Sequence, residues 1–343
     1  MSASSIGRVP AGLARRRAAG ASRQLSAYQR ATLSNRCISH TARLQDARGD
    51  DVDSRIKDLG RRIADDYASL RDSYETPKHP VVLAHGLLGF AELKLAGSLL
   101  PPIHYWHGIK DALEAQGTRV ITAAVPPSGT IEERAARLSD EIAHRAAGES
   151  VNIIAHSMGG LDARYMISRL RPPGVDVRSL VTIATPHHGS GFADYLFDEI
   201  GEAYLPRVYR LWERTTGLGT GAFSQLTRRY MAEDFNPRTP DSPDVRYFSY
   251  GAMLLRKPPL LSPFRLSHKV VEKAEGPNDG LVSVQSARWG TYKGTLLGVN
   301  HLDLINWTNK LRWTLRRWMG QREMFNAVAF YLDIADMLAK EKL

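Results

Sequence analysis

The chain has 343 residues, 43% of them hydrophobic and 24% charged, so it can bury a large core and is neither collagen-like nor disordered throughout. Its net charge is +10, yet eight of its 46 basic residues lie in residues 1–45, and the remaining 38 nearly balance the 36 acidic ones. Because the body is close to neutral, nucleic acid is excluded as the expected partner.

Residues 1–45 contain eight arginines and no lysine, aspartate or glutamate. A segment rich in Arg, Ser and Ala and free of acids has the composition of a mitochondrial transit peptide. We therefore expect a cleaved mitochondrial presequence here, and the alternative is a disordered basic arm. The only cysteine, Cys37, lies within it, so the mature chain would form neither a disulfide nor a thiolate metal site.

Residues 46–77 are predicted to form an amphipathic helix. Apolar side chains recur there at intervals of three and four: Val52, Ile56, Leu59, Ile63, Tyr67, Leu70 and Tyr74. This spacing places them on one helical face. That face needs a partner surface, which we expect to be the main domain rather than another protein.

From residue 78 onward, strand and helix patterns alternate. Strands are predicted at 81–84, 119–123, 151–155, 179–184 and 245–250, and helices at 106–116, at 131–147, from 158, and at about 302–318 and 322–340. Such alternation, with continuous apolar strands, predicts an α/β fold with a mainly parallel sheet and helices on both faces. We assign residues 78–320 to this domain and residues 321–343 to a C-terminal helix.

Residues 190–240 interrupt the alternation. They are rich in bulky side chains and include Gly217, Gly219 and Gly221. A helical insertion with glycine hinges is typical of a cap or lid over an active site. An ordinary packed helical layer is the alternative.

Residues 155–160, Ala-His-Ser-Met-Gly-Gly, lie between an apolar strand and a helix. This is the context of a nucleophile elbow, a sharp turn that lifts a serine hydroxyl out of the carboxyl edge of a sheet. The small residues Ala155 and Gly159 flank Ser157 and let the strand and helix approach closely. Alanine stands where glycine is usual and is the next smallest side chain. After a buried strand, the motif predicts that Ser157 is a nucleophile.

A serine hydroxyl becomes nucleophilic when a histidine removes its proton and a carboxylate holds that histidine in the right tautomer. In the fold that carries this elbow, the acid and then the histidine follow the serine along the chain. Asp279 lies in a turn before a Val-rich stretch, and His301 lies between a strand-like run and a helical pattern. Both fall on loops at element ends, and we predict a Ser157–Asp279–His301 triad.

Other candidates fit this order less well. His187, His188 and His268 all precede the late acid, and the first two are interpreted as pocket lining. Asp303 is an alternative acid, but it follows the predicted catalytic histidine by two residues and so reverses the order.

Residues 85–90, His-Gly-Leu-Leu-Gly-Phe, follow the first predicted strand of the domain. In the fold that carries the nucleophile elbow, the loop after this strand supplies one backbone N–H of an oxyanion hole. The residue after the nucleophile supplies the other. We therefore expect the N–H groups of Leu87 and Met158 to bind the oxyanion, each contributing roughly 3 kcal/mol. By itself the HGxxG pattern also fits a plain turn, and it is the combination with the elbow that favours this function.

Several stretches of the chain together carry a family resemblance. They are PVVLAHGLLGF at 80–90, YWHGI at 105–109, AHSMGG at 155–160, ATPHHGS at 184–190, DGLV at 279–282 and NHLD at 300–303. In this order the chain resembles the bacterial true lipases. The Arg-rich leader and the late helices make it more similar still to the fungal mitochondrial triacylglycerol lipases. The resemblance covers about residues 78–320 and implies an α/β-hydrolase fold, the triad and the oxyanion donors named above.

Two features of the bacterial lipases are not matched. Their disulfide has no counterpart in a chain with one cysteine. Their structural calcium uses the Asp two residues after the catalytic histidine, here Asp303, and a second Asp about twenty residues before the catalytic acid. No Asp or Glu lies between Asp244 and Glu272, although a hard cation needs several oxygen ligands. We therefore expect no metal or cofactor, and Asp303 to cap or orient the histidine loop.

Residues 303–323 combine positive charge with tryptophan. The charges between Asp303 and Glu323 are all positive, and Trp307, Trp313 and Trp318 are interleaved with them. This composition is typical of an interfacial surface resting on anionic lipid, so a peripheral membrane contact is one hypothesis. A helix packed on the sheet, with its arginines solvated, is the favoured alternative.

These observations predict a mitochondrial lipase or carboxylesterase that hydrolyses acyl esters of glycerol, triacylglycerol or diacylglycerol, through an acyl-enzyme. The nearest alternative is an acyltransferase or phospholipase, because the same elbow transfers acyl groups to alcohols when water is excluded. A non-catalytic membrane or assembly protein is disfavoured, because all three predicted triad residues are present.

Overall fold

The computed structural model describes residues 59–87, 92–93, 103–146, 148–200, 221–260, 262–307 and 325–343. The chain divides into two compact units, residues 1–53 and 54–343, and every described residue belongs to the second. The predicted presequence lies outside the described residues, as do most of the Trp- and Arg-rich stretch and the middle of the predicted cap.

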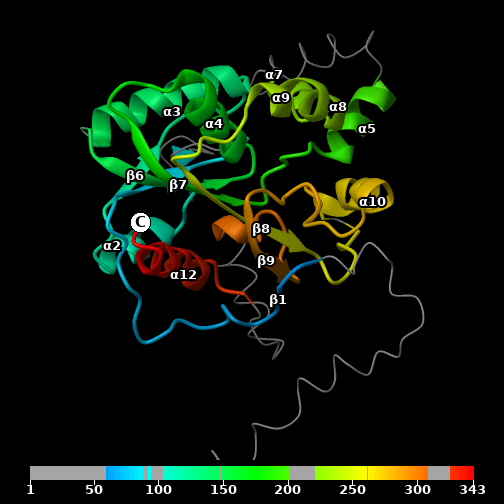
Figure 1. Ribbon diagram of the computed structural model, residues 1–343. Coiled ribbons are helices and arrows are strands. Elements are labelled where there is room, and N and C mark those ends of the chain that lie inside the picture. Colours follow the sequence, from blue (N-terminus) through cyan, green and yellow to red (C-terminus); the bar gives the residue numbers. More distant parts are fainter. Residues whose placement is uncertain are drawn as a thin grey trace, which may run out of the picture. The chain divides into compact units, whose positions relative to one another are not determined.

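A seven-stranded sheet runs through the described part of the chain (Figure 1). Its strands are β1 (Arg62–Ile63), β2 (Val81–Ala84), β5 (Val120–Ala123), β6 (Ser150–His156), β7 (Asp176–Ile183), β8 (Arg246–Met253) and β9 (Thr291–Leu297). They are ordered β1-β9-β8-β7-β6-β2-β5, and all neighbouring pairs are parallel. The carboxyl ends of these strands therefore share one edge, where ligands of open α/β sheets bind.

Helices cover both faces of this sheet. One face carries α2 (Ile109–Ala115) and α12 (Ala327–Lys340), and the other carries α3 (Ile131–Ala146), α4 (Gly159–Tyr165) and the π-helical η2 (Met166–Leu170) (Figure 1). Within β2, Val81 and Leu83 pack in the first layer, whereas Val82 and Ala84 pack in the second. Successive strand residues point to opposite faces, so a fully apolar strand fits between two helical layers. The predicted parallel sheet with helices on both faces is confirmed.

Short helices occupy the described parts of the predicted cap: α5 (Gly191–Ile200), α7 (Gly221–Ser224), α8 (Arg228–Tyr230), η3 (Met231–Phe235) and α9 (Asn236–Arg238). Ala222, Met231 and Phe235 form a buried cluster with Met158 and Leu161 at the start of α4. The insertion thus packs directly over the turn that contains the predicted nucleophile. Whether it opens and closes as a lid stays a prediction.

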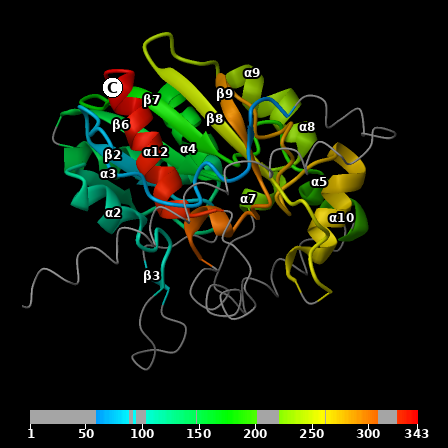
Figure 2. The same cartoon turned by 90° about the horizontal axis from the view of Figure 1, so that it is seen from below.

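The remaining elements are short or were not expected. β3 (Glu92–Leu93) and β4 (Ile103–His104) form a separate antiparallel pair, and η4 (Asp303–Ile305) is a 3-10 turn. The helix α10 (Phe264–Glu275) is not among the predicted helices. It lies beside α5 at one end of the domain (Figure 2).

The described part of the predicted helix at 46–77 is not helical, so this prediction is wrong for residues 59–77. Gly60 adopts a φ of +64°, and β1 then pairs with the edge of the sheet at β9. Tyr67 packs on Phe330 of α12, with ring centroids 5.1 Å apart. Leu59, Ile63 and Tyr67 are buried in this non-helical segment, whereas Leu70 is exposed. Tertiary contacts thus override weak local periodicity.

Candidate active site

Ser157 occupies the sharp turn between β6 and α4. Its φ is +55°, in the left-handed region that residues with a side chain rarely adopt. The turn is fixed on both sides, since the Ser157 N–H donates to the Ile183 carbonyl at 3.0 Å and Gly160 N–H donates to the Ser157 carbonyl at 3.1 Å. Thr185 Oγ1 donates to the same Ser157 carbonyl at 2.7 Å. Such an over-determined strained residue is typical of a functional site.

Gly159 and Gly160 are required because other parts of the protein come very close to their Cα atoms. A Cβ at Gly159 would lie 2.5 Å from the Ala84 carbonyl oxygen, at the end of the neighbouring strand β2. A Cβ at Gly160 would overlap the side chain of Thr185. The helix α4 can therefore start against the sheet only with glycine at these positions.

A hydrogen-bonded series joins three loops at the carboxyl edge of the sheet. His301, which follows β9, lies with Nε2 3.0 Å from Ser157 Oγ and with Nδ1 2.7 Å from Asp279 Oδ2. The His301 backbone N–H also donates to the Asp279 carbonyl at 3.0 Å. His301 is 5% exposed and Asp279 is fully buried, so this contact is shielded from solvent. The three residues of the predicted triad are thus brought together.

The second carboxylate oxygen of Asp279 is also occupied. Asp279 Oδ1 accepts the backbone N–H groups of Leu281 at 2.9 Å and Val282 at 2.8 Å. The carboxylate plane is therefore fixed, with one oxygen held by the loop and the other directed at His301. Backbone donors satisfy a buried carboxylate without adding a competing charge.

The loop that follows β2 lies against the serine turn. A Cβ at Gly86 would come within 2.7 Å of Ser157 Cβ. The N–H groups of Gly86 and Ser157 donate to protein acceptors, whereas those of Leu87 and Met158 have no protein acceptor among the described residues. These two groups are the predicted oxyanion donors, and both side chains belong to the cluster beneath the cap.

A neutral hydrogen-bonded series holds this loop. The Gly86 N–H donates to Tyr105 Oη at 3.0 Å, and Tyr105 Oη lies 2.7 Å from His156 Nδ1. Burial, and next the neighbouring His301, lower the pKa of His156 well below its ordinary value. Tyr105 Oη accepts the Gly86 N–H, and its own hydrogen can donate to Nδ1 in the tautomer of neutral His156 that carries its proton on Nε2. The residue before Ser157 is thereby tied to the loop that follows β2.

A buried ion pair also contacts the loop that follows β2. Arg134 of α3 is fully buried, and its Nη2 lies 2.7 Å from Asp162 Oδ2 of α4. Its guanidinium also donates to the His85 carbonyl at 2.7 Å and to the Pro126 carbonyl at 2.6 Å. One side chain therefore links the helix after Ser157 to two loops at the carboxyl edge.

His85 itself is neutral. Burial, and next Arg134, lower the pKa of its imidazole to about 4. Its Nε2 accepts the Val125 N–H at 3.3 Å, so Nδ1 carries the proton and donates to the Gly86 carbonyl at 3.0 Å. His85 is thus a structural part of the loop rather than a titrating group.

His187 is not pocket lining, because it is fully buried. Its Nε2 lies 2.9 Å from Thr182 Oγ1, and its ring stacks on Trp289 at 5.2 Å between centroids. The guanidinium of Arg164 covers the same indole at 3.5 Å from the centroid and donates to Asn236 Oδ1 at 2.9 Å. The cluster joins α4 to the last cap helix.

The calcium site of the bacterial lipases does not fit this chain. Asp303 Oδ2 accepts the Asn300 N–H at 3.3 Å and so caps its own turn beside the predicted catalytic histidine. Within the described ranges, no group of three or more His, Cys, Asp or Glu side chains is arranged to hold a metal ion.

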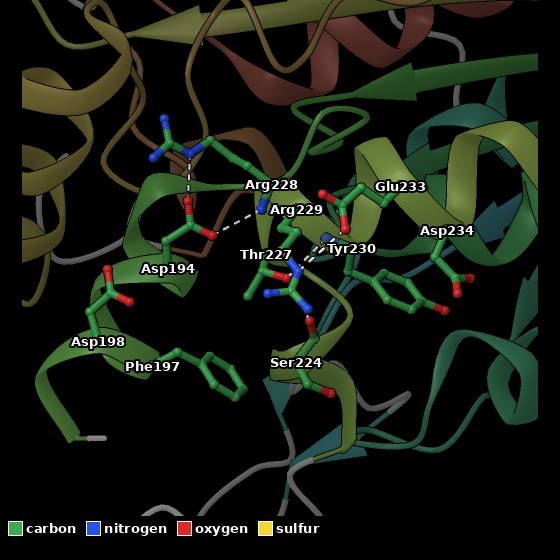
Figure 3. Close-up of a pocket in the computed structure, with 10 residues that line it drawn as sticks. All are labelled: Asp194, Phe197, Asp198, Ser224, Thr227, Arg228, Arg229, Tyr230, Glu233 and Asp234. Atoms are coloured by element: carbon green, nitrogen blue, oxygen red, sulfur yellow. Dashed lines mark hydrogen bonds and ion pairs between the residues drawn. The ribbon is translucent and has the colours of Figure 1, made fainter. Parts of the chain in front are cut away.

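A cavity of about 910 Å³ lies within the cap, between α5 and the segment from α7 to η3 (Figure 3). It is lined by carboxylates, arginines, two aromatic rings and the hydroxyls of Ser224 and Thr227, and no residue of the predicted triad is among them. Arg228 bridges it: its N–H and Nε donate to the Asp194 carboxylate at 3.0 and 2.5 Å. The ion pair fixes α8 against α5, which is a structural role within the cap.

Sequence reasoning missed Tyr105, His156 and Arg134 as parts of the site. Arg134 carries a readable signal, because it falls on the buried stripe of α3 between Ile131 and Leu138, where a charge needs a buried partner. Tyr105 lies in the family stretch at 105–109, but nothing in that stretch indicates its contact with the loop after β2.

Solved structures similar to this chain include lipases and an esterase. A family model described as a PGAP1-like alpha/beta domain matches residues 131–227. Staphylococcus hyicus lipase superposes with a TM-score of 0.58 at 19% identity, covering 79% of this chain and 98% of that one. The chain therefore has the α/β-hydrolase fold, as predicted.

Comparison with known sequences identifies the family within this fold. Triacylglycerol lipase 2 of Saccharomyces cerevisiae is 39% identical over 321 residues, which cover 80% of this chain and 96% of the yeast protein. Triacylglycerol lipase of Pseudomonas fragi is 27% identical over 311 residues, covering 79% of this chain and 99% of the relative. The chain belongs to the triacylglycerol lipase family and is a carboxylic ester hydrolase. In the described part of the chain, no helix is long and apolar enough to span a bilayer.

Proposed function

We propose that this enzyme hydrolyses acyl esters of glycerol, triacylglycerol or diacylglycerol, with Ser157 as nucleophile, His301 as general base and Asp279 as its acidic partner. The observation that carries the proposal is the unbroken series from Asp279 through His301 to Ser157, with contacts of 2.7 and 3.0 Å. Relatives matched over almost their whole length are named triacylglycerol lipases, which supports the substrate class.

In the acylation step, Ser157 Oγ attacks the ester carbonyl carbon while its proton passes to His301 Nε2. The resulting imidazolium is stabilised by the Asp279 carboxylate, which accepts from Nδ1. Negative charge develops on the former carbonyl oxygen, where the N–H groups of Leu87 and Met158 stabilise it. When the ester bond breaks, His301 gives its proton to the departing alcohol oxygen and an acyl-Ser157 remains.

In the deacylation step, His301 takes a proton from water, whose oxygen attacks the acyl carbon. The same two N–H groups stabilise the second tetrahedral intermediate. His301 then returns the proton to Ser157 Oγ as the fatty acid leaves. If a lipid alcohol replaced the water, the identical series would transfer the acyl group instead of hydrolysing it.

The cellular setting is part of the proposal. The acid-free, Arg-rich composition of residues 1–45 supports import into mitochondria followed by cleavage. Import of the radiolabelled full chain into isolated mitochondria, with protease protection and N-terminal sequencing, tests it. A protein that stays accessible to protease and uncut would refute this location.

The catalytic assignment is tested with the purified full chain, Ser157→Ala and His301→Ala on soluble p-nitrophenyl esters and on emulsified glycerol esters. Both variants should lose at least about 10⁴-fold in kcat while keeping the thermal unfolding midpoint of the parent. Glycerol added as acceptor separates hydrolysis, which yields free fatty acid, from transfer, which yields a new ester. Folded variants that stay active would refute the roles of Ser157 and His301.

A further inference from the structure

The loop between β8 and α10, together with the start of α10, carries an unusual combination of exposed side chains. Of the five large hydrophobic side chains that are exposed in the described residues, Leu255, Leu260 and Leu266 lie here, 52%, 82% and 52% exposed. Exposed cations are interleaved with them: Arg256, Lys257, Arg265, Lys269 and Lys273. We call these eight residues the basic-leucine surface.

The charge of this surface is mainly positive. No Asp or Glu lies between Asp244 and Glu272 in the sequence, and Glu272, on the same side of α10 as the cations, lies 3.9 Å from His268. Arg265, Lys269 and Lys273 are spaced by four and therefore lie on one side of α10. Single exposed leucines need no explanation, but three beside five cations form a patch that suits an apolar and anionic partner.

The loop is built to present its leucine outward. Pro258 is buried, whereas the following Pro259 and Leu260 are exposed. The Arg265 guanidinium donates to the Pro258 carbonyl at 2.7 Å and so fixes the base of the loop to α10. Two consecutive prolines limit the backbone freedom of the loop, and Leu260 is held at its tip.

The surface adjoins the catalytic loops. Because the loop follows a strand of the parallel sheet, it leaves the same edge as the loops of Ser157 and His301. At its start, the Leu254 N–H donates to the Asn278 carbonyl at 2.9 Å, next to the proposed catalytic acid. The Met253 carbonyl accepts the Gly298 N–H at 2.8 Å, close to the histidine loop.

We propose that the basic-leucine surface docks this enzyme on a bilayer that contains anionic phospholipid. The leucines enter the boundary between headgroups and acyl chains, and the cations meet the phosphate groups around them. Docked in this way, the carboxyl edge of the sheet and its acyl-accepting serine face the membrane. The purpose of docking rests on the proposed lipid substrate, but the binding itself does not depend on catalysis.

Co-sedimentation of the full chain with vesicles tests the proposal, with Ser157→Ala in every protein so that no lipid is consumed. Vesicles of phosphatidylcholine are compared with vesicles containing about one third phosphatidylserine, since surface charge is the variable. The parent should bind the anionic vesicles at least about tenfold more tightly, and added salt should weaken that preference.

Two variants divide the surface into its parts. Leu255→Ser with Leu260→Ser removes apolar contact, and Arg256→Glu with Lys257→Glu reverses charge. Each pair should weaken binding to anionic vesicles by roughly tenfold or more. Matched controls lie elsewhere: Leu70→Ser, at a leucine 56% exposed, and Arg62→Glu with Lys78→Glu, at two exposed cations. The controls should bind as the parent does.

The same changes in the active enzyme separate docking from catalysis. Hydrolysis of a soluble p-nitrophenyl ester should be unchanged, whereas hydrolysis of diacylglycerol in anionic vesicles should fall in step with binding. Binding that survives both variant pairs would assign any lipid contact to another surface, such as residues 303–323, and would overturn the proposal. Equal binding to neutral and anionic vesicles would overturn it as well. An inert parent on soluble ester would instead contradict the proposed function.

Discussion

Two buried imidazoles lie next to each other beside Ser157 and are held in different ways. His301 is backed by the carboxylate of Asp279 at 2.7 Å. His156 is backed by the uncharged hydroxyl of Tyr105, also at 2.7 Å. The centroids of the two imidazole rings are only 4.6 Å apart, so the charge of one acts directly on the other.

In the proposed mechanism, this difference lets one residue type perform two tasks in one site. A base that takes up a proton needs a negative partner to stabilise the imidazolium. A residue that only holds a loop works best uncharged, because a second positive charge at this distance would oppose protonation of the base. Burial lowers the pKa of His156 well below its ordinary value, and the hydroxyl partner supplies no charge to raise it.

The largest effect is expected when the carboxylate behind the base is made neutral. Asp279→Asn keeps the shape of the side chain but removes the negative charge and permits the wrong histidine tautomer. We expect kcat on a soluble ester to fall by about 10⁴-fold with little change in stability. Asp303→Asn is the matched control, since this carboxylate caps the neighbouring turn, and it should lose less than about tenfold. A larger loss for Asp303→Asn would assign the acid to that residue.

A substitution at Arg134, which holds the loop after β2, should lower the stability of the protein. Arg134→Met removes the cation and leaves Asp162 as a buried carboxylate without its partner, which costs about 3–5 kcal/mol in the free energy of unfolding. The His85 and Pro126 carbonyls also lose their donor. Denaturant unfolding measures the loss, and a variant as stable as the parent would contradict the role of the ion pair.

A double variant separates stability from loop position. Arg134→Met with Asp162→Leu removes both charges, so much of the stability should return. The carbonyl of His85 still lacks its donor, and we therefore expect kcat to stay reduced while KM changes little. Recovery of both stability and kcat would show that Arg134 acts through the ion pair alone.

A smaller effect is expected at the phenol that ties His156 to the loop. Tyr105→Phe leaves the Gly86 N–H and His156 Nδ1 without their partner in a buried place, and we expect kcat to fall roughly tenfold. Tyr331→Phe is the control, because that buried hydroxyl has no hydrogen-bond partner among the described residues. Unchanged kcat in Tyr105→Phe, or an equal loss in both variants, would remove this residue from the site.

The central part of the fold could be predicted because its signals are local. The strand at 81–84 is a continuous apolar run, and β2 has the same bounds, Val81–Ala84. The turn at Ser157 could be predicted because small residues and a serine follow an apolar strand. In these places the residues that decide the structure are neighbours in the sequence.

The predictions failed where contacts between residues distant in the sequence determine the structure. Residues 59–77 have helical spacing, but pairing with β9 and packing on α12 determine their conformation. Arg134 joins the site only because α3 passes beneath the loop at His85, which no local pattern reveals. Tyr105 contributes through contacts to residues 19 positions before it and 51 after it.

The smallest effect is expected for a substitution at Asp336, a carboxylate outside the candidate site that can be compared with the buried Asp279. Asp336 of α12 is 4% exposed and accepts the Glu75 N–H at 2.8 Å, with Lys340 and Arg71 beside it at 2.7 and 2.9 Å. Burial raises the pKa of Asp336, but these donors outweigh it and lower the pKa from 3.8 to about 2. They anchor residues 71–75 to α12, and part of the charge is screened because Lys340 and Arg71 are partly exposed.

Because the folded-state pKa of Asp336 is below its ordinary value, the ionised group stabilises the fold above about pH 4 and loses this effect as the pH falls toward 2. Asp336→Asn should therefore lower the free energy of unfolding by about 1 kcal/mol at neutral pH. The difference from the parent should shrink as the pH falls below 4 and should be small at pH 2. Urea unfolding of both proteins across this range measures it, with Asp72→Asn, an exposed carboxylate on the same segment, as control. A difference that does not change with pH would mean that the amide disturbs packing, and that the ionised carboxylate contributes nothing to the anchor.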